Sequence, residues 1–114
     1  QSFKGTNKYS LIENELHKKI INKCKQLGVT PYAYYMACYN ILLSKFSGME
    51  DICVGVPSSG RNGKHINTLG MFVNMLSLRS QPTGTKTFND FANEIKEKYI
   101  YTRSFYCYSW NCNK

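Results

Sequence analysis

The segment between Thr30 and Gly48 constrains the fold of this chain more than any other feature. Thr30-Pro31 supplies a helix N-cap followed by proline at the first helical position, and Gly48 supplies a helix stop. Apolar residues occur nearly all round the helix predicted between them: Tyr35, Met36, Ala37, Cys38, Tyr39, Ile41, Leu42, Leu43 and Phe46. A helix that is apolar all round has to be buried, so the other elements are expected to pack around it.

The spacing of apolar residues predicts two further helices. One begins at Glu15 and ends at Gly28, and its apolar positions are Leu16, Ile20, Ile21, Cys24 and Leu27. The other begins after Thr87-Phe88-Asn89-Asp90, which resembles a capping box. Its apolar face consists of Phe88, Phe91, Ala92, Ile95 and Tyr99. Each of these helices therefore has one face to bury.

Three stretches of the sequence predict strands, the first of them at residues 8–12. The second, residues 52–56, is a continuous apolar run between Asp51 and Pro57, which is typical of a strand covered on both faces inside a sheet. The third, residues 71–80, follows a polar segment at 58–68 with the composition of a loop. The predicted order is β-α-α-β-β-α, an α/β fold in the form of a two-layer sandwich.

The charge of the chain biases it towards polyanions without specifying one. Fifteen basic and seven acidic side chains give a net charge of +8 in 114 residues, a length that fits one domain or a piece of one. Twelve of the basic residues are lysines scattered along the chain, whereas base reading and phosphate clamping favour arginine. We therefore expect no nucleic-acid partner, although a small basic nucleic-acid-binding module stays open as an alternative.

The cysteines and the absence of a membrane or signal pattern favour the reducing cytoplasm. Five cysteines without regular spacing are unlike a secreted disulfide framework, and no apolar run is long enough to cross a membrane. Cys24, Cys38 and Cys53 fall on predicted buried faces, so we expect them to be small core residues. No histidine lies near the closely spaced Cys107 and Cys112, so no metal site is expected.

Candidate sites are few when the residues are considered alone. Residues 55–60 have the glycine spacing of a phosphate loop, but Arg61-Asn62 follow in place of the lysine and hydroxyl residue that such a loop needs. His65 would act as a base in a stand-alone acyltransferase, a second alternative, but no nucleophile or orienting carboxylate can be tied to it by sequence. Asn74 interrupts an apolar strand, so its amide faces either a cavity or solvent.

The segment Leu69-Gly70-Met71-Phe72-Val73-Asn74, with Arg79 after it, resembles a motif of the condensation domains of non-ribosomal peptide synthetases. That motif is usually written [IV]-G-x-F-V-N-T, and this chain has Met75 in place of the threonine. Further segments resemble the same surfactin-synthetase-like family in the same order: 27–30, 41–44, 48–52, 54–57 and 60–61. The resemblance covers about residues 3–103, a central stretch of a much longer domain.

The resemblance implies part of the second lobe of a chloramphenicol-acetyltransferase-like fold, in which two lobes enclose a tunnel. The complete domain would join a carrier-bound donor thioester to an acceptor amine in peptide antibiotic biosynthesis. Its implied partners are the missing first lobe and the carrier proteins, whose phosphopantetheine arms bring the substrates. Asn74, Phe72, Arg79, Ser58 and Arg61 are the residues that the resemblance places at the tunnel or at a binding surface.

The resemblance also predicts what this chain lacks. The catalytic motif H-H-x-x-x-D-G does not occur in it, so we expect no catalytic residue and no activity of the chain alone. We expect residues 1–103 to be a partial condensation domain and residues 104–114 to be a divergent aromatic tail. Apolar surface left without its partner lobe favours a homodimer, formed through this tail or through a sheet edge.

Overall fold

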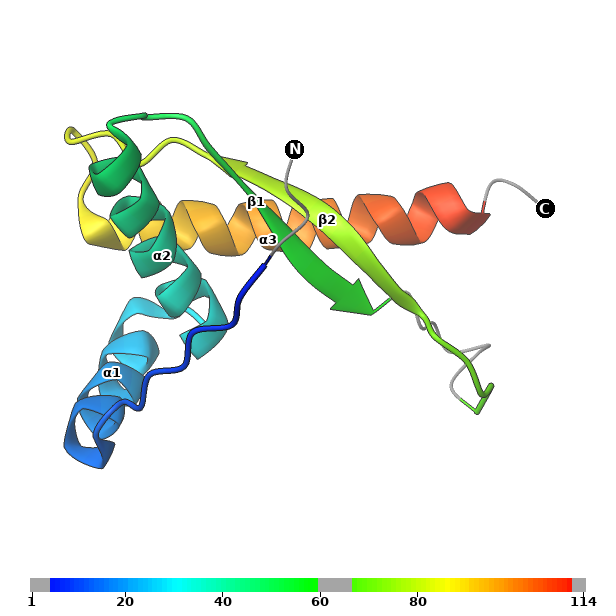
Figure 1. Ribbon diagram of the computed structural model, residues 1–114, viewed down its shortest axis with the longest axis horizontal. Coiled ribbons are helices and arrows are strands. Elements are labelled where there is room, and N and C mark those ends of the chain that lie inside the picture. The colour runs from blue at the N-terminus through cyan, green and yellow to red at the C-terminus, as the bar shows by residue number, and fades with distance from the viewer. Residues whose placement is uncertain (1–4, 60–66, 112–114) are drawn as a thin grey trace.

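Three helices and one antiparallel hairpin form the structure, a computed structural model that describes residues 5–59 and 67–111, with side chains up to residue 104. The helices are α1 (Asn14–Leu27), α2 (Pro31–Ser47) and α3 (Phe88–Asn111), and the strands are β1 (Ile52–Ser59) and β2 (Val73–Ser80). α3 lies across one face of the hairpin, and α2 crosses the N-terminal part of α3 (Figure 1). α1 continues the helical layer beyond α2, while the turn end of the hairpin projects away from both helices (Figure 1).

Local chemistry sets the ends of α1 and α2 where the sequence predicts them. Gly28 has a φ of 64° and Gly48 a φ of 69°, left-handed conformations in which a residue with a side chain is strained. Thr30 accepts a hydrogen bond on Oγ1 from the amide of Ala33 at 3.2 Å, and Pro31 occupies the first turn. The predicted helix stops and the predicted N-cap are therefore confirmed.

The pairing of β1 with β2 gives the hairpin an inner and an outer face. The register runs from Ile52 opposite Ser80 to Ser59 opposite Val73. Because side chains alternate along a strand, Val56, Leu76 and Leu78 all point to the inner face, where each is 1% exposed. The core below this face is completed by side chains of α3: Phe91, Ala92 and Ile95.

α2 and α3 pack closely because small residues line their contact. Ala37 and Ala92 are both fully buried and belong to the same core cluster. Aromatic pairs flank this contact, with ring centroids 4.9 Å apart for Tyr32 and Tyr99 and 5.0 Å apart for Tyr34 and Phe88. Close helix packing thus places α3 where it can also cover the sheet.

The α/β class is confirmed, but the strand predicted at residues 8–12 is wrong. Residues 5–13 have no regular secondary structure, and Tyr9 and Leu11 are 87% and 102% exposed. Among the described residues β1 and β2 pair only with each other, and residues 5–13 add no strand to either open edge of this sheet. The order among the described residues is therefore α-α-β-β-α.

Two predictions of complete burial are also wrong. β1 is covered on one face only, so Cys53 is exposed, and Cys38 of α2 is exposed as well, whereas Cys24 is buried as predicted. α2 buries Ala33, Ala37 and Asn40 but leaves Phe46 85% exposed. An apolar pattern indicates a tendency to be buried. In the described structure, however, the neighbouring elements cover only one side of β1 and only one side of α2.

Candidate functional site

Asn74 and Ser58 face each other at the turn end of the hairpin. The strand register places these two residues directly opposite, beside the last pair, Ser59 and Val73. Ser58 is 7% exposed and Asn74 is half-buried, and both lie on the same inner face as Val56 and Leu76. An amide and a hydroxyl therefore end the apolar inner face of the sheet, at the edge next to the β1–β2 connection.

Gly70 and Phe72 of the motif lie close together just before β2. Gly70 has a φ of 148°, which residues with a side chain rarely adopt. A Cβ added to Gly70 would lie 3.5 Å from Cε2 of the half-buried Phe72 ring. Leu69 and Met71, by contrast, are 99% and 91% exposed. A glycine thus suits this position, where the backbone has a positive φ and the Phe72 ring lies close by.

Arg79 lies at the other end of β2 and on the opposite face. It is five positions from Asn74, which corresponds to about 17 Å along a strand. Its Nε donates to Oδ1 of Asp51 at 2.8 Å, and its Nη2 donates to Oδ2 of the same carboxylate. The hydrogen bonds from Arg79 lower the pKa of Asp51, and the same contact raises the pKa of Arg79. The structure therefore does not bring Arg79 together with Asn74.

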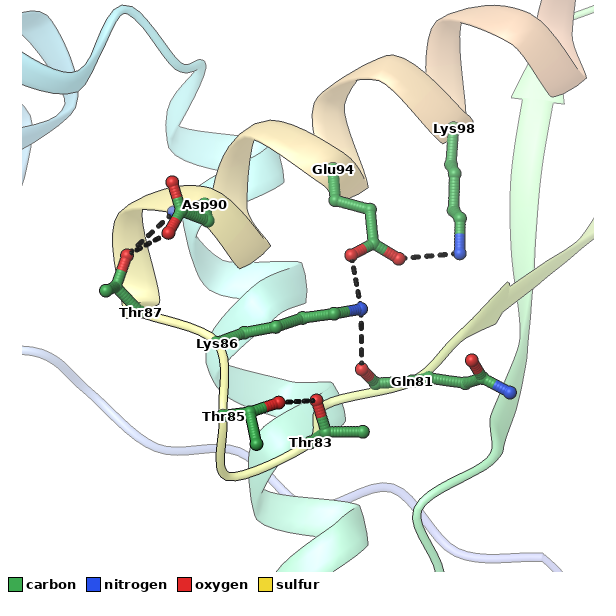
Figure 2. A network of polar contacts seen from close by, with 8 residues as sticks. All are labelled: Gln81, Thr83, Thr85, Lys86, Thr87, Asp90, Glu94 and Lys98. Carbon is green, nitrogen blue, oxygen red and sulfur yellow. Dashed lines mark hydrogen bonds and ion pairs between the residues drawn. The ribbon is translucent and has the colours of Figure 1, made fainter.

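A second polar cluster joins the β2–α3 connection to α3, as Figure 2 shows. Lys86 donates to the backbone oxygen of Gln81 at 3.0 Å and to Oε2 of Glu94 at 2.6 Å, while Lys98 contacts Oε1 of Glu94 at 2.7 Å. Burial raises the pKa of Glu94, but the hydrogen bonds from Lys86 and Lys98 outweigh burial and hold this pKa below its usual value. Sequence reasoning missed this cluster because no motif marks it.

Thr87 is the N-cap of α3, as predicted for the first residue of the capping box. Thr87 Oγ1 accepts from the amide of Asp90 at 3.2 Å and donates to the carboxylate of Asp90 at 2.6 Å (Figure 2). Together with the contacts of Lys86, this cap fixes where α3 begins relative to β2. The cluster is therefore a structural corner of the fold.

Two surface hollows lie away from the Asn74–Ser58 pair. One, of about 460 Å³, lies between β2 and α3 and is lined by residues that include Ser77, Arg79 and Tyr101. The other, of about 550 Å³, lies between the C-terminal end of α2 and the β2–α3 connection and includes Lys45 and Phe88. Neither of these two hollows includes Asn74.

The remaining candidates are Arg61 and the two histidines, of which only His17 lies in the described part of the chain. Arg61 and His65 lie outside the described residues. His17 is exposed on α1, with Nδ1 3.4 Å from the hydroxyl of Tyr35 on α2. In the described part of the chain no helix has the length and apolar character needed to cross a membrane.

The family model "Condensation domain" matches residues 1–105. Bacitracin synthase 1 from Bacillus licheniformis is 46% identical to this chain over 101 residues, which are 88% of the chain and 2% of that protein. Tyrocidine synthase 3 from Brevibacillus parabrevis is 42% identical over 101 residues, again 88% of the chain and 2% of that protein. The chain thus spans a small fraction of these relatives.

Solved structures agree on the fold. The SgcC5 protein from Streptomyces globisporus superposes with a TM-score of 0.72 at 26% identity, covering 79% of this chain and 20% of that one. The condensation domain of the Monacolin K polyketide synthase MokA gives a TM-score of 0.74 at 23% identity, covering 82% of this chain and 21% of that one. These matches confirm the resemblance seen in the motif around Asn74. The chain belongs to the condensation-domain family and is a fragment of such a domain.

Proposed function

We propose that this chain is a second-lobe portion of a condensation domain and that the complete domain joins two carrier-bound groups in a non-ribosomal peptide synthetase. In that reaction the acceptor amine attacks the carbonyl carbon of the donor thioester. The C–N bond forms, the C–S bond breaks, and the phosphopantetheine thiol leaves with a proton. The similarity of residues 1–105 to the family supports this function more than any other observation.

The role proposed for this part of the domain is to shape the substrate tunnel. Asn74 carries both a hydrogen-bond donor and an acceptor, so its amide can bind an amide group of a substrate or of a phosphopantetheine arm. Its position opposite Ser58 at the end of the inner face supports such a role. We propose that Phe72 and Arg61 belong to the same tunnel surface. In this proposal the phosphopantetheine arm that Asn74 contacts arrives on a carrier protein and is not a resident cofactor of this chain.

Arg79 has a different proposed role. Its guanidinium binds both carboxylate oxygens of Asp51, at the end of the strand remote from Asn74. We therefore propose that Arg79 acts as a positioning residue that fixes the connection between α2 and β1. Carrier proteins and the first lobe are the proposed partners, and the free thiols of Cys24, Cys38 and Cys53 fit a cytoplasmic synthetase.

The chain alone is proposed to be inactive. Amide formation from a thioester needs two oriented substrates, and orientation supplies up to several kcal/mol. A positioned base adds about 10²–10⁴-fold. Of the two histidines, His17 is exposed on α1 with no described carboxylate contact, and the sequence contains no H-H-x-x-x-D-G motif. The comparisons give no support to the stand-alone acyltransferase or to the nucleic-acid-binding module.

A segment exchange tests the proposal. Residues 1–105 replace the matching segment of the related condensation domain of bacitracin synthase 1, and amide formation is measured with loaded donor and acceptor carriers. We expect the exchanged domain to form product and Asn74→Ala to reduce its rate at least about tenfold, as for the loss of one positioned polar group. Ser77→Ala is the control, because Ser77 lies on the same strand but on the outer face.

Three results would contradict the proposal. The first is an Asn74→Ala domain that keeps the full rate while the exchanged domain is active. The second is a folded exchanged domain, shown by its circular dichroism, that forms no product. The third is turnover by the 114-residue chain alone that disappears in His65→Ala, which would favour the stand-alone acyltransferase.

A further inference from the structure

The inner face of the hairpin changes from apolar to polar at its turn end. Val56 and Leu76 lie opposite each other and are each 1% exposed, and the next pair on the same face is Ser58 and Asn74. Ser58 is buried although its hydroxyl adds no apolar surface to the core. Burying a hydroxyl costs free energy unless a hydrogen bond replaces its contact with water. The position of Ser58 therefore indicates a polar partner.

The burial of Ser58 does not depend on the other parts of a condensation domain. The residues that cover it belong to the described structure, and further chain can only add cover to a side chain that is already buried. Its place opposite Asn74 follows from the register between β1 and β2. Both observations are therefore properties of this segment itself.

The register brings the two polar side chains within reach of each other. Directly opposite residues on one face of an antiparallel pair have Cβ atoms about 4.5–5.5 Å apart. Among the described residues neither side chain is engaged in a hydrogen bond, so no group there competes for the pair. Rotation about the side-chain bonds of Asn74 is enough to bring one end of its amide within about 2.7–3.2 Å of the Ser58 hydroxyl.

We infer that Ser58 is a positioning residue that orients the Asn74 amide towards the substrate, an inference that rests on the proposed function of Asn74. The amide has a donor end and an acceptor end, which exchange places when it turns by about 180°. A buried donor is rarely left without an acceptor, so the Ser58 hydroxyl donates to Oδ1 of Asn74. Nδ2 is then left to donate to a carbonyl oxygen of the substrate or of a phosphopantetheine arm.

Ser80 provides a matched control at the other end of the same face. It is fully buried, it lies opposite the apolar Ile52, and its Oγ has no hydrogen-bond partner in the described structure. Six positions separate it from Asn74, which corresponds to about 20 Å along a strand. Ser80→Ala thus removes a buried hydroxyl from the inner face without affecting the contact with Asn74.

The mobility of the Asn74 side chain in the 114-residue chain gives the first test. ¹⁵N relaxation reports the order parameter of the side-chain NH₂ group, whose signal is assigned by its loss in Asn74→Ala. We expect Ser58→Ala to lower this order parameter, and Ser58→Thr, which keeps the hydroxyl, to preserve it. Ser80→Ala should leave it unchanged. An Asn74 amide that is equally ordered with and without the Ser58 hydroxyl would overturn the inference. Circular dichroism checks that each variant is folded.

Rates in the exchanged condensation domain show whether this orientation matters for the reaction. Ser58→Ala should reduce kcat/KM about two- to tenfold, the effect of one neutral hydrogen bond, and Ser80→Ala should not. In the Asn74→Ala domain, Ser58→Ala should cause no further loss, because a positioning residue acts only through the group that it positions. Equal losses from Ser58→Ala in both backgrounds would assign it a merely structural role and overturn the inference.

The two tests keep the inference apart from the proposed function. An exchanged domain in which Asn74→Ala keeps the full rate contradicts the proposed function, whatever the mobility of the amide. An active exchanged domain that needs Asn74 but is unaffected by Ser58→Ala contradicts the positioning role alone.

Discussion

At the scale of single residues, the contact between Arg79 and Asp51 joins two segments that are 28 positions apart. Arg79 lowers the pKa of Asp51 by hydrogen bonding. A carboxyl whose pKa is lower in the folded state stabilises the fold above its unfolded value of about 3.9, and this stabilisation is lost as the pH falls through the folded value. The contribution is small and salt-dependent because both side chains are exposed.

Asp51→Asn should therefore lower the urea midpoint slightly at about pH 7 and by less near pH 2, because the stabilisation by Asp51 is lost as the pH falls through its folded-state pKa. Glu50→Gln is the control, as the neighbouring carboxyl makes no described contact with Arg79. A midpoint that drops equally at both pH values would show that the loss has a cause other than the charge of Asp51.

At the scale of elements, α2 depends on the cap supplied by Thr30. Thr30→Ala removes the oxygen that accepts from the amide of Ala33 and should reduce the free energy of unfolding by about 0.5–2 kcal/mol. Thr30→Ser keeps the oxygen and should stay near the stability of the original chain. Urea unfolding followed by circular dichroism measures both variants, and equal losses in the two would speak against the cap.

At the scale of the whole molecule, one core cluster connects all five elements. It contains Cys24 of α1, Ala37 of α2, Val56 of β1, Leu76 of β2 and Ile95 of α3, among others. Ile95 is fully buried, so Ile95→Ala should cost about 2–5 kcal/mol through lost burial and a cavity. Ile100→Ala, on the same helix but at a site 57% exposed, should cost much less. Urea unfolding of both variants in one cooperative transition is the expected result, and comparable losses would contradict a single core.

The elements that could be predicted from the sequence are those with strong local signals. Gly28, Gly48 and the Thr30 cap set helix ends through contacts within a few residues, and they lie where predicted. The motif around Asn74 identifies the family for a similar reason, because its residues are consecutive. The position of Asn74 opposite Ser58, however, follows from the strand register, which depends on residues in another strand.

What could not be predicted depends on how the elements cover one another. Leu42 and Phe46 have the apolar character of core residues, yet the described structure covers only the other side of α2. The same holds for Cys53 on the outer face of the hairpin. The Arg79–Asp51 pair joins positions 28 apart, and the Lys86–Glu94 contact joins a connection to the helix that follows it, and no motif marks either contact. Hydrophobic pattern indicates which residues tend to be buried, but tertiary packing decides which face receives cover.

The sharing of Glu94 between two lysines has a consequence for the chemical reactivity of the chain. Acylation of a lysine requires a free electron pair on its nitrogen and room for the reagent, and Lys86 donates both to Gln81 and to Glu94. Lys18 and Lys19, on the exposed side of α1, have no such contacts with a carboxylate among the described residues. Modification should therefore reach Lys18 and Lys19 before Lys86, and the connection between β2 and α3 should keep its shape while these α1 lysines lose their charge.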